Sequence, residues 1–118
     1  MNVAIVGATG YGGIQAVNLL KKNKKYKITF LGGNKTSGSK WNDKFPFISL
    51  DTNPYIEKIT VENISNKADI ALLCLPNGIS STLTRKLLEK GLKVIDLSAD
   101  YRYKSLDEWK KIYSKEAA

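Results

Sequence analysis

The sequence predicts an α/β fold, a doubly wound and mainly parallel sheet with helices on both faces. Short runs rich in Val, Ile and Leu recur along the chain, and amphipathic segments separate them. A glycine-rich turn joins the first apolar run to the first amphipathic segment. Strands buried on both faces are continuous apolar runs, and their alternation with helices indicates parallel strands joined by crossovers. The 118 residues fit one domain.

The first half of the chain is predicted to form a strand, a helix and a second strand. Residues 2–6 form a short apolar run that ends at a glycine, which is typical of a buried strand. Residues 11–22 carry apolar side chains at helical spacing, and residues 27–31 alternate as a strand does. A polar loop at 32–40 follows, and residues 41–57 have no clear period. We expect a long irregular crossover there, with a short strand within it as the alternative.

The second half repeats the pattern. Residues 58–62 are predicted as a short strand, and residues 68–75 as a buried strand that ends before a proline. A second amphipathic helix is expected at 79–90, followed by a strand at 93–97. A last helix is expected at 105–113, because a serine precedes acidic residues in what would be its first turn.

Composition excludes several kinds of site. The single cysteine excludes an internal disulfide, and the absence of histidine excludes a Cys-His or Ser-His pair within this chain. We therefore expect no metal site. No apolar run is long enough to cross a membrane, so a soluble, cytoplasmic protein with no membrane partner is expected.

The net charge of +8 raises the question of a nucleic-acid partner. Of the 19 basic residues, 17 are lysine, whereas base-edge and phosphate recognition favours arginine. The lysines are also scattered. We expect no nucleic acid as the physiological partner, and we assign the positive potential to anionic small molecules and to a solvated surface.

The glycine-rich turn at residues 7–13, Gly-Ala-Thr-Gly-Tyr-Gly-Gly, is the sharpest functional signal. It follows a predicted strand and leads into a helix, which is the context of a dinucleotide-binding turn in a Rossmann-like fold. Glycines let the backbone approach a diphosphate, and the helix N-terminus offers unpaired amides to it. The alternative is a turn that only packs the helix on the strand. The candidate residues are Gly7, Thr9, Gly10, Tyr11, Gly12 and Gly13.

The loop after the second predicted strand indicates which dinucleotide binds. An NAD domain usually has a carboxylate there that holds the ribose hydroxyls. No carboxylate lies between Tyr26 and Asn42, whereas Asn34, Lys35 and Thr36 have side chains that can bind a 2′-phosphate. The predicted cofactor is therefore NADP. A solvated loop is the alternative for Lys35.

Two further segments leave predicted strands at the same edge of the sheet, where ligands of open α/β sheets bind. Leu75, Pro76 and Asn77 open the second helix, and Asn77 can hydrogen-bond a cofactor or cap that helix. Ser98 can reach the nicotinamide side of the cofactor. Arg102 has a planar guanidinium suited to a phosphate or carboxylate, or to an ion pair with a neighbouring aspartate.

Residues 6–13, 75–78 and 96–102 together resemble the N-acetyl-γ-glutamyl-phosphate reductase family of arginine biosynthesis, and more widely the semialdehyde dehydrogenases. The resemblance implies an NADP-dependent acyl-phosphate reductase, an aldehyde-forming oxidoreductase in which a cysteine thiolate forms a thioester and NADPH delivers hydride. Arg102 would contact the acyl phosphate. Residues 1–118 would be the NAD(P)-binding domain, expected to be a fragment. The catalytic cysteine and histidine, and a catalytic and dimerisation domain of a homo-oligomer, would lie outside it.

The sequence departs from the family pattern at two positions: Gly12 replaces the usual threonine and Asn77 a frequent histidine. Cys74 does not match the nucleophile and is expected to be a buried structural thiol within the third strand. No catalytic residue is expected in this chain, which should be inactive alone. The alternatives are an aspartate-semialdehyde dehydrogenase-like enzyme domain and a non-catalytic NADP-binding module.

Overall fold

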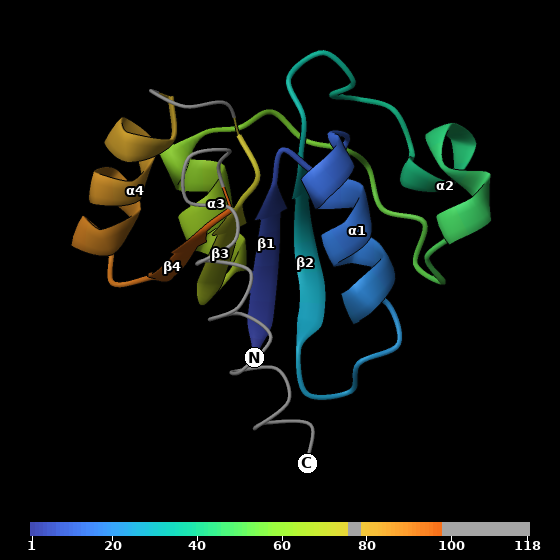
Figure 1. The fold of residues 1–118 in the computed structure, drawn as a ribbon, viewed down its shortest axis with the longest axis horizontal. Coiled ribbons are helices and arrows are strands. Elements are labelled where there is room, and N and C mark those ends of the chain that lie inside the picture. The colour runs from blue at the N-terminus through green and yellow to red at the C-terminus, as the bar shows by residue number, and fades with distance from the viewer. Residues whose placement is uncertain (76–78, 98–118) are drawn as a thin grey trace.

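The computed structural model describes residues 1–75 and 79–97, and within them the fold centres on one parallel sheet. The sheet has four strands in the order β2-β1-β3-β4, and every neighbouring pair is parallel. The strands are β1 (Asn2–Val6), β2 (Lys27–Gly32), β3 (Ile70–Leu73) and β4 (Lys93–Asp96). Figure 1 shows them with helices packed on both sides, so the doubly wound α/β prediction is confirmed.

Helices cover the two faces of the sheet separately (Figure 1). The helices are α1 (Tyr11–Leu20), α2 (Trp41–Lys44), α3 (Val61–Lys67) and α4 (Ile79–Glu89), with a 3₁₀ turn, η1 (Pro46–Ile48). Apolar residues of α1 and the buried Trp41 of α2 pack on one face. The buried Ile64 of α3 and Leu87 of α4 pack on the other.

Strand β1 divides its side chains between the two cores. Val3 and Ile5 belong to the core under α1, whereas Ala4 and Val6 belong to the core under α3 and α4. All four are fully buried. Alternate residues of a strand point to opposite faces of a sheet, so a central strand covered on both faces must be apolar throughout. The first apolar run of the sequence is therefore the centre of the fold.

The sheet has a topological switch point between β1 and β3. The chain leaves β1 through α1 to reach β2 on one side, and it later returns to β3 on the other side. Val6 is in register with both Gly32 and Leu73, so the three strands end at one edge. Ligands of open α/β sheets bind outside the carboxyl ends of the strands at such a point.

The predicted strand at 58–62 is wrong. A helix, α3, begins at Val61 instead, because Thr60 caps it: the Thr60 Oγ1 accepts a 3.0 Å hydrogen bond from the amide of Asn63. The β-branched side chains in this segment suggested a strand, but local capping and the buried Ile64 decide for a helix. The strand predicted at 68–75 is shorter, at 70–73, and the other predicted strands and helices within the described residues form close to their expected bounds. The helix expected at 105–113 lies outside those residues.

The crossover at 41–57 is irregular, as expected, but it contains the short helix α2 and the turn η1. Single bridges pair Lys40 with Tyr55 and Gly32 with Glu57. The amides of Gly33 and Glu57 also form backbone hydrogen bonds across this contact, to the carbonyls of Glu57 and Leu31. The segment before α3 therefore lies against the end of β2.

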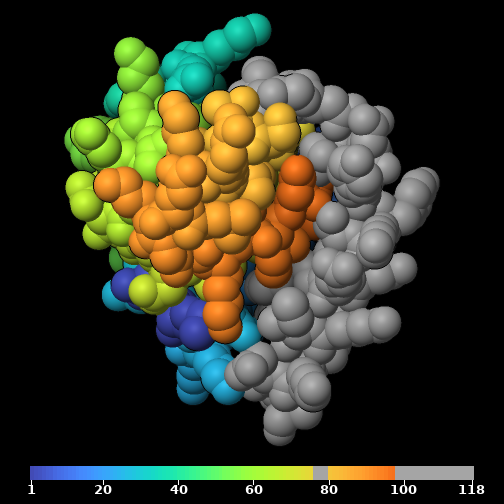
Figure 2. All heavy atoms as spheres, turned by 90° about the vertical axis from the view of Figure 1, so that its left-hand side faces the viewer, coloured from blue at the N-terminus to red at the C-terminus, as the bar shows by residue number. Residues whose placement is uncertain are grey.

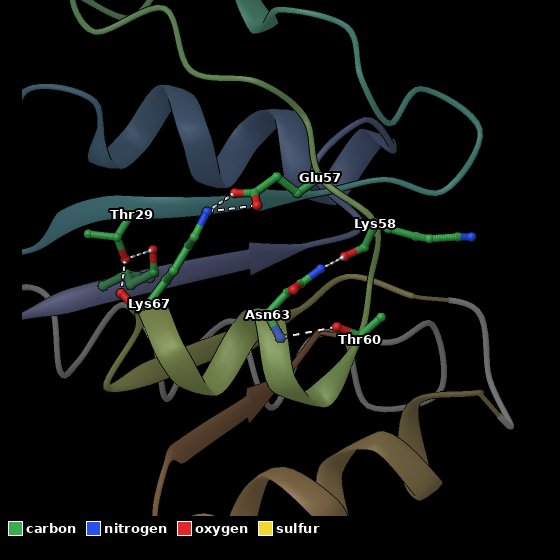
Figure 3. A network of polar contacts seen from close by, with 7 residues as sticks. Thr29, Glu57, Lys58, Thr60, Asn63 and Lys67 are labelled. Atoms are coloured by element: carbon green, nitrogen blue, oxygen red, sulfur yellow. Dashed lines mark hydrogen bonds and ion pairs between the residues drawn. The ribbon is translucent and has the colours of Figure 1, made fainter.

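A polar network fastens α3 to this segment and to β2 (Figure 3). The Lys67 ammonium binds both carboxylate oxygens of Glu57, at 2.6 and 2.7 Å. The Thr29 hydroxyl donates to the Lys67 carbonyl at 2.6 Å, and the Asn63 amide group donates to the Lys58 carbonyl at 3.1 Å. These contacts fix both ends of α3 relative to the loop that follows β2.

Across residues 1–75 and 79–97, none of the helices combines the length and the apolar character that a membrane span requires.

Candidate functional site

Two glycines of the turn at 7–13 are required by the protein's own packing. Gly7 has φ +84°, and a Cβ there would lie 2.5 Å from the Cys74 carbonyl oxygen. A Cβ on Gly13 would collide with the Gly7 carbonyl oxygen and lie 2.6 Å from Cα of Ala8. The ends of β1 and β3 and the start of α1 thus meet backbone to backbone. Any side chain at these two positions would force them apart.

The other two glycines of the turn have no such packing role. Gly10 has an ordinary extended conformation, φ −83° and ψ 171°, and a Cβ there would meet only the Gly7 carbonyl oxygen at 3.6 Å. A Cβ on Gly12 would lie 3.9 Å from Cβ of Cys74. Both distances are normal van der Waals contacts. The described residues give no steric reason for glycine at these positions, whereas close approach of a ligand to the backbone does.

The amides of the turn fall into two groups. Those of Gly7 and Ala8 both donate to the Gly32 carbonyl at 2.9 Å, and that of Gly10 donates to the Gly7 carbonyl at 3.2 Å. These bonds hold the turn against the end of β2. Within residues 1–75 and 79–97, the amides of Thr9, Gly12 and Gly13 donate to no protein acceptor. The anion-binding part of the turn is therefore the start of α1 rather than the whole glycine run.

Electrostatics distinguishes the two helices that begin at this edge of the sheet. The first turn of α1 contains no acidic residue, so no side chain of that turn compensates the positive end of its dipole. At the start of α4, the buried Ser80 hydroxyl donates a 2.7 Å hydrogen bond to the Asp96 carboxylate from the end of β4. The negative charge of that carboxylate compensates the positive N-terminal end of the α4 dipole. An anionic ligand is therefore favoured at α1 and not at α4.

The loop after β2 lies beside the glycine turn. A Cβ on Gly33 would be 3.3 Å from Cγ2 of Thr9 and 2.8 Å from Oγ1 of Thr36. That Thr36 hydroxyl is buried and has no hydrogen-bond partner within the described residues. A buried hydroxyl without a partner is costly, and a ligand atom that bonds to it would remove the cost. Lys35, which precedes Thr36 in this loop, is exposed.

Asn34 anchors this loop to the segment before α3. The Asn34 Oδ1 accepts a 3.0 Å hydrogen bond from the amide of Ile59, and the Asn34 carbonyl accepts one from the Ser37 hydroxyl at 3.1 Å. The side-chain amide of Asn34 is thereby held in one orientation at the edge of the sheet. The loop is a defined structure rather than a loosely solvated one.

A groove of about 430 Å³ lies next to Asn34, between the start of α3 and the middle of α4. Figure 2 looks onto this side of the molecule, where α4 lies in front with α3 beside it. The groove brings together two predicted residues, Asn34 and Leu75, with residues that the sequence did not single out. These are Ile59, Thr60, Val61, Thr82, Leu83 and Lys86.

The described site residues thus converge on one edge of the sheet. Tyr11 is exposed at the first position of α1, and Leu75 is half-buried, with Cδ2 3.1 Å from the position of a Cβ on Gly7. Lys35 is not among the described residues that line the groove. The remaining predicted residues lie outside the described part of the chain: Pro76, Asn77, Ser98 and Arg102.

Cys74 differs from the expectation of a buried thiol inside a strand. Strand β3 ends at Leu73, and Cys74 is half-buried one residue beyond it, at the edge where the site residues converge. The expected strand at 68–75 was too long at both ends because the apolar run extends past the residues that pair in register, although the Cys74 amide still donates to the Val6 carbonyl at 2.8 Å. Within the described residues, no group of His, Cys, Asp and Glu side chains could hold a metal ion.

Comparisons with known proteins show the family of the chain. Residues 2–115 match the family model "Semialdehyde dehydrogenase, NAD binding domain". The whole chain is 86% identical to an N-acetyl-gamma-glutamyl-phosphate reductase of Prochlorococcus marinus strain MIT 9215 and covers 34% of it. It is 55% identical to the reductase of strain SARG, covering 33%. The chain therefore spans about a third of the length of these relatives.

Solved structures share the fold. Aspartate semialdehyde dehydrogenase of Candida albicans, solved with NADP, aligns with a TM-score of 0.71 at 21% identity, over 86% of this chain and 30% of that one. Aspartate semialdehyde dehydrogenase II of Vibrio cholerae aligns with a TM-score of 0.63 at 24% identity, over 86% of this chain and 32% of that one. Because the family model matches residues 2–115, nearly the whole chain, this chain belongs to the NAD-binding domains of the semialdehyde dehydrogenase family.

Proposed function

We propose that this chain supplies the cofactor-binding part of an enzyme that reduces N-acetyl-γ-glutamyl phosphate to N-acetylglutamate semialdehyde with NADPH. The identity to reductases of that name supports the substrate. The observation that carries the proposal is the contrast within the glycine turn. Gly7 and Gly13 are required by packing, whereas Gly10 and Gly12 leave space that no described residue uses.

The diphosphate of the cofactor would bind at the start of α1. The amides of Thr9, Gly12 and Gly13 have no acceptor within the described residues, and the helix dipole favours an anion beside them. Gly10 at the N-cap carries no Cβ that would keep a phosphate oxygen from the backbone. Tyr11 is exposed next to them and would cover the bound diphosphate.

The adenosine end would lie beyond β2. The apolar floor of the groove suits an adenine ring, and the ribose would lie toward Asn34 and Thr36. The Thr36 hydroxyl, which no described residue pairs, would donate to a ribose or phosphate oxygen. No carboxylate lies between Tyr26 and Asn42, which is the basis for proposing NADP rather than NAD.

The nicotinamide end would extend beyond β3 and β4. Ser98 would lie on the nicotinamide side of the cofactor, Pro76 and Asn77 would contact the cofactor between its two ends, and NADPH, when bound, supplies the hydride. Arg102 would bind the acyl phosphate of the substrate. The chain contains no histidine, and its single cysteine, Cys74, does not match the nucleophile of the family, so both groups of the cysteine-histidine pair would come from outside residues 1–118. A homo-oligomer of the longer protein belongs to the same proposal.

Cofactor binding can be tested on the 118-residue chain by titration calorimetry with NADPH and with NADH. We expect a one-to-one complex with NADPH and a Kd at least about tenfold higher for NADH, a difference of roughly 1.4 kcal/mol. A chain that binds neither dinucleotide would contradict the proposal. Equal binding of both would contradict the preference for NADP alone.

The activity can be tested in a chimera. These 118 residues would replace the corresponding third of the 86%-identical relative, and the oxidation of N-acetylglutamate semialdehyde by NADP⁺ and phosphate would be followed at 340 nm. We expect turnover from the chimera and none from the 118-residue chain alone. Turnover of aspartate semialdehyde instead would favour the aspartate-semialdehyde dehydrogenase alternative.

A further inference from the structure

We propose that Lys86, on α4, is a specificity-determining residue that binds the 2′-phosphate of NADP in the groove that it lines together with Asn34 of the β2 loop. This inference rests on the proposed cofactor function and deepens it. The sequence assigned the 2′-phosphate to the loop after β2 alone, through Asn34, Lys35 and Thr36. The groove adds a cation from a helix more than 45 residues further along the chain.

The groove has the composition of a site for an aromatic base with an anionic substituent. Ile59, Leu75 and Leu83 supply apolar surface. Asn34 and Thr82 supply hydrogen-bonding groups, and both are exposed. Sites for small molecules are typically apolar with a few convergent polar groups that fix orientation. An adenine ring would lie on the apolar part, and its ribose phosphate would reach the polar residues.

Its charge distinguishes Lys86 from the other described residues that line the groove. Of the described residues that line the groove, it alone is charged, and none carries a carboxylate. Lys35, the cation that the loop offers, is exposed and is not among them. A 2′-phosphate in the groove would therefore meet one positive charge and no negative one. A lysine ammonium is a compact point charge on a flexible stem, which suits a phosphate at the rim of a groove.

The backbone that carries Lys86 is held firmly. The adjacent Leu87 is fully buried in the core under α4. At the other end of the helix, Ser80 is 2% exposed and hydrogen-bonded to Asp96. The position of Lys86 relative to Asn34 is therefore set by the fold, although its side chain is exposed. Lys86 also lies in the last turn of α4, where a cation stabilises the helix dipole, and the test must separate the two roles.

The test compares NADPH with NADH, which differ only in the 2′-phosphate. In the 118-residue chain, Lys86→Gln should raise the Kd for NADPH roughly tenfold, as expected for one lost charged contact, and leave the Kd for NADH within about twofold. Arg85→Gln is the matched control, because Arg85 is the exposed neighbour on α4 that does not line the groove. Lys86→Arg, which keeps the charge, should retain most of the NADPH affinity.

The outcomes are distinct. Equal weakening of NADPH and NADH by Lys86→Gln, or an equal effect of Arg85→Gln on NADPH, would overturn the inference in favour of helix stability or general surface charge. An unchanged NADPH affinity would overturn it as well. If the unaltered chain binds both dinucleotides equally, the 2′-phosphate assignment fails while the cofactor domain stands. If it binds neither, the proposed function itself fails.

Discussion

The hydroxyl of Ser80 and the carboxylate of Asp96 form a 2.7 Å hydrogen bond between the first turn of α4 and the last residue of β4. Ser80 is 2% exposed and Asp96 is half-buried, so water competes weakly for the Ser80 hydroxyl. A hydrogen bond to an ionised acceptor is stronger than a hydrogen bond to a neutral acceptor. The carboxylate also compensates the positive N-terminal end of the α4 dipole. One contact therefore fixes the helix that forms a wall of the groove and keeps anions away from that helix start.

Asp96→Ala should destabilise the chain by about 1–3 kcal/mol, because it leaves the buried Ser80 hydroxyl without its acceptor. Asp96→Asn keeps an acceptor oxygen and should cost less. Asp43→Ala, at an exposed position on α2, is the control and should change the free energy of unfolding by less than about 0.5 kcal/mol. Urea unfolding followed by circular dichroism measures all three. Equal losses from Asp96→Ala and Asp43→Ala would show that the hydrogen bond contributes nothing.

The central strands could be predicted from sequence because a strand buried on both faces of the sheet must be a continuous apolar run. Residues 3–6 are apolar without interruption, and the strand there is buried on both faces. The segment at 58–62 was not predictable in this way. Its β-branched residues favour a strand, and the decision for a helix depends on Thr60 as a cap and on Ile64 reaching a core built by distant strands.

Part of the candidate site could likewise be predicted from sequence, and part could not. The glycine turn could be located from sequence, because a strand, glycines and a helix are contiguous. Which glycines the protein itself requires could not, because the Gly7 contact is with Cys74, and that proximity exists only after β1 and β3 pair. Lys86 gave no signal in the sequence either. On a helical pattern it is one more solvated lysine, and only the packing of α4 beside α3 brings it to the same groove as Asn34.

Gly10→Ser should separate binding from stability. Serine is at least as good an N-cap as glycine, and φ −83° suits it, so the free energy of unfolding should stay within about 0.5 kcal/mol or rise. The new side chain would occupy the space proposed for the diphosphate, and NADPH affinity should fall by at least roughly tenfold. Calorimetry and thermal unfolding of the same sample give both quantities.

Gly13→Ala is the opposite case. Its methyl group would collide with the Gly7 carbonyl and with Ala8, so a loss of stability of about 1–3 kcal/mol is expected before any ligand is added. If Gly10→Ser destabilised the chain as much as Gly13→Ala, or left NADPH binding intact, Gly10 would be a packing glycine and the ligand explanation would be lost.

Thr60→Ala should cost about 1 kcal/mol, because the amide of Asn63 loses the side-chain acceptor that begins α3. Thr60→Ser keeps the hydroxyl and is the control, with an expected change of a few tenths of a kcal/mol. Thermal unfolding of the three chains checks the order. A Thr60→Ser chain as unstable as Thr60→Ala would point to the methyl group rather than to the cap.

The ion pair between Lys67 and Glu57 should contribute little despite its short distances. Both side chains are partly exposed, at 45% and 29%, so water and salt screen the attraction. Glu57→Gln should lower the free energy of unfolding by less than about 1 kcal/mol, and 1 M NaCl should remove most of that difference. A loss of several kcal/mol that persists in salt would contradict this expectation.

Asn34→Asp should abolish or reverse the preference for NADPH over NADH without disturbing the loop. Aspartate keeps the oxygen that accepts the 3.0 Å hydrogen bond from the amide of Ile59, so the loop should retain its conformation. The added negative charge lies on the groove, where it would repel a 2′-phosphate and accept from the free ribose hydroxyls of NADH. The Kd for NADPH should rise at least roughly tenfold while that for NADH stays constant or falls.

The control for this charge reversal is Asn66→Asp, which makes the same change at an exposed position on α3 that does not line the groove. It should leave the ratio of the two dissociation constants within about twofold of the unaltered chain. A parallel rise in both constants for Asn34→Asp would mean that the loop had been disrupted. An identical shift in Asn66→Asp would mean that the preference reflects net charge alone. A shift confined to Asn34→Asp would indicate that the absence of a carboxylate after β2 is what admits the extra phosphate.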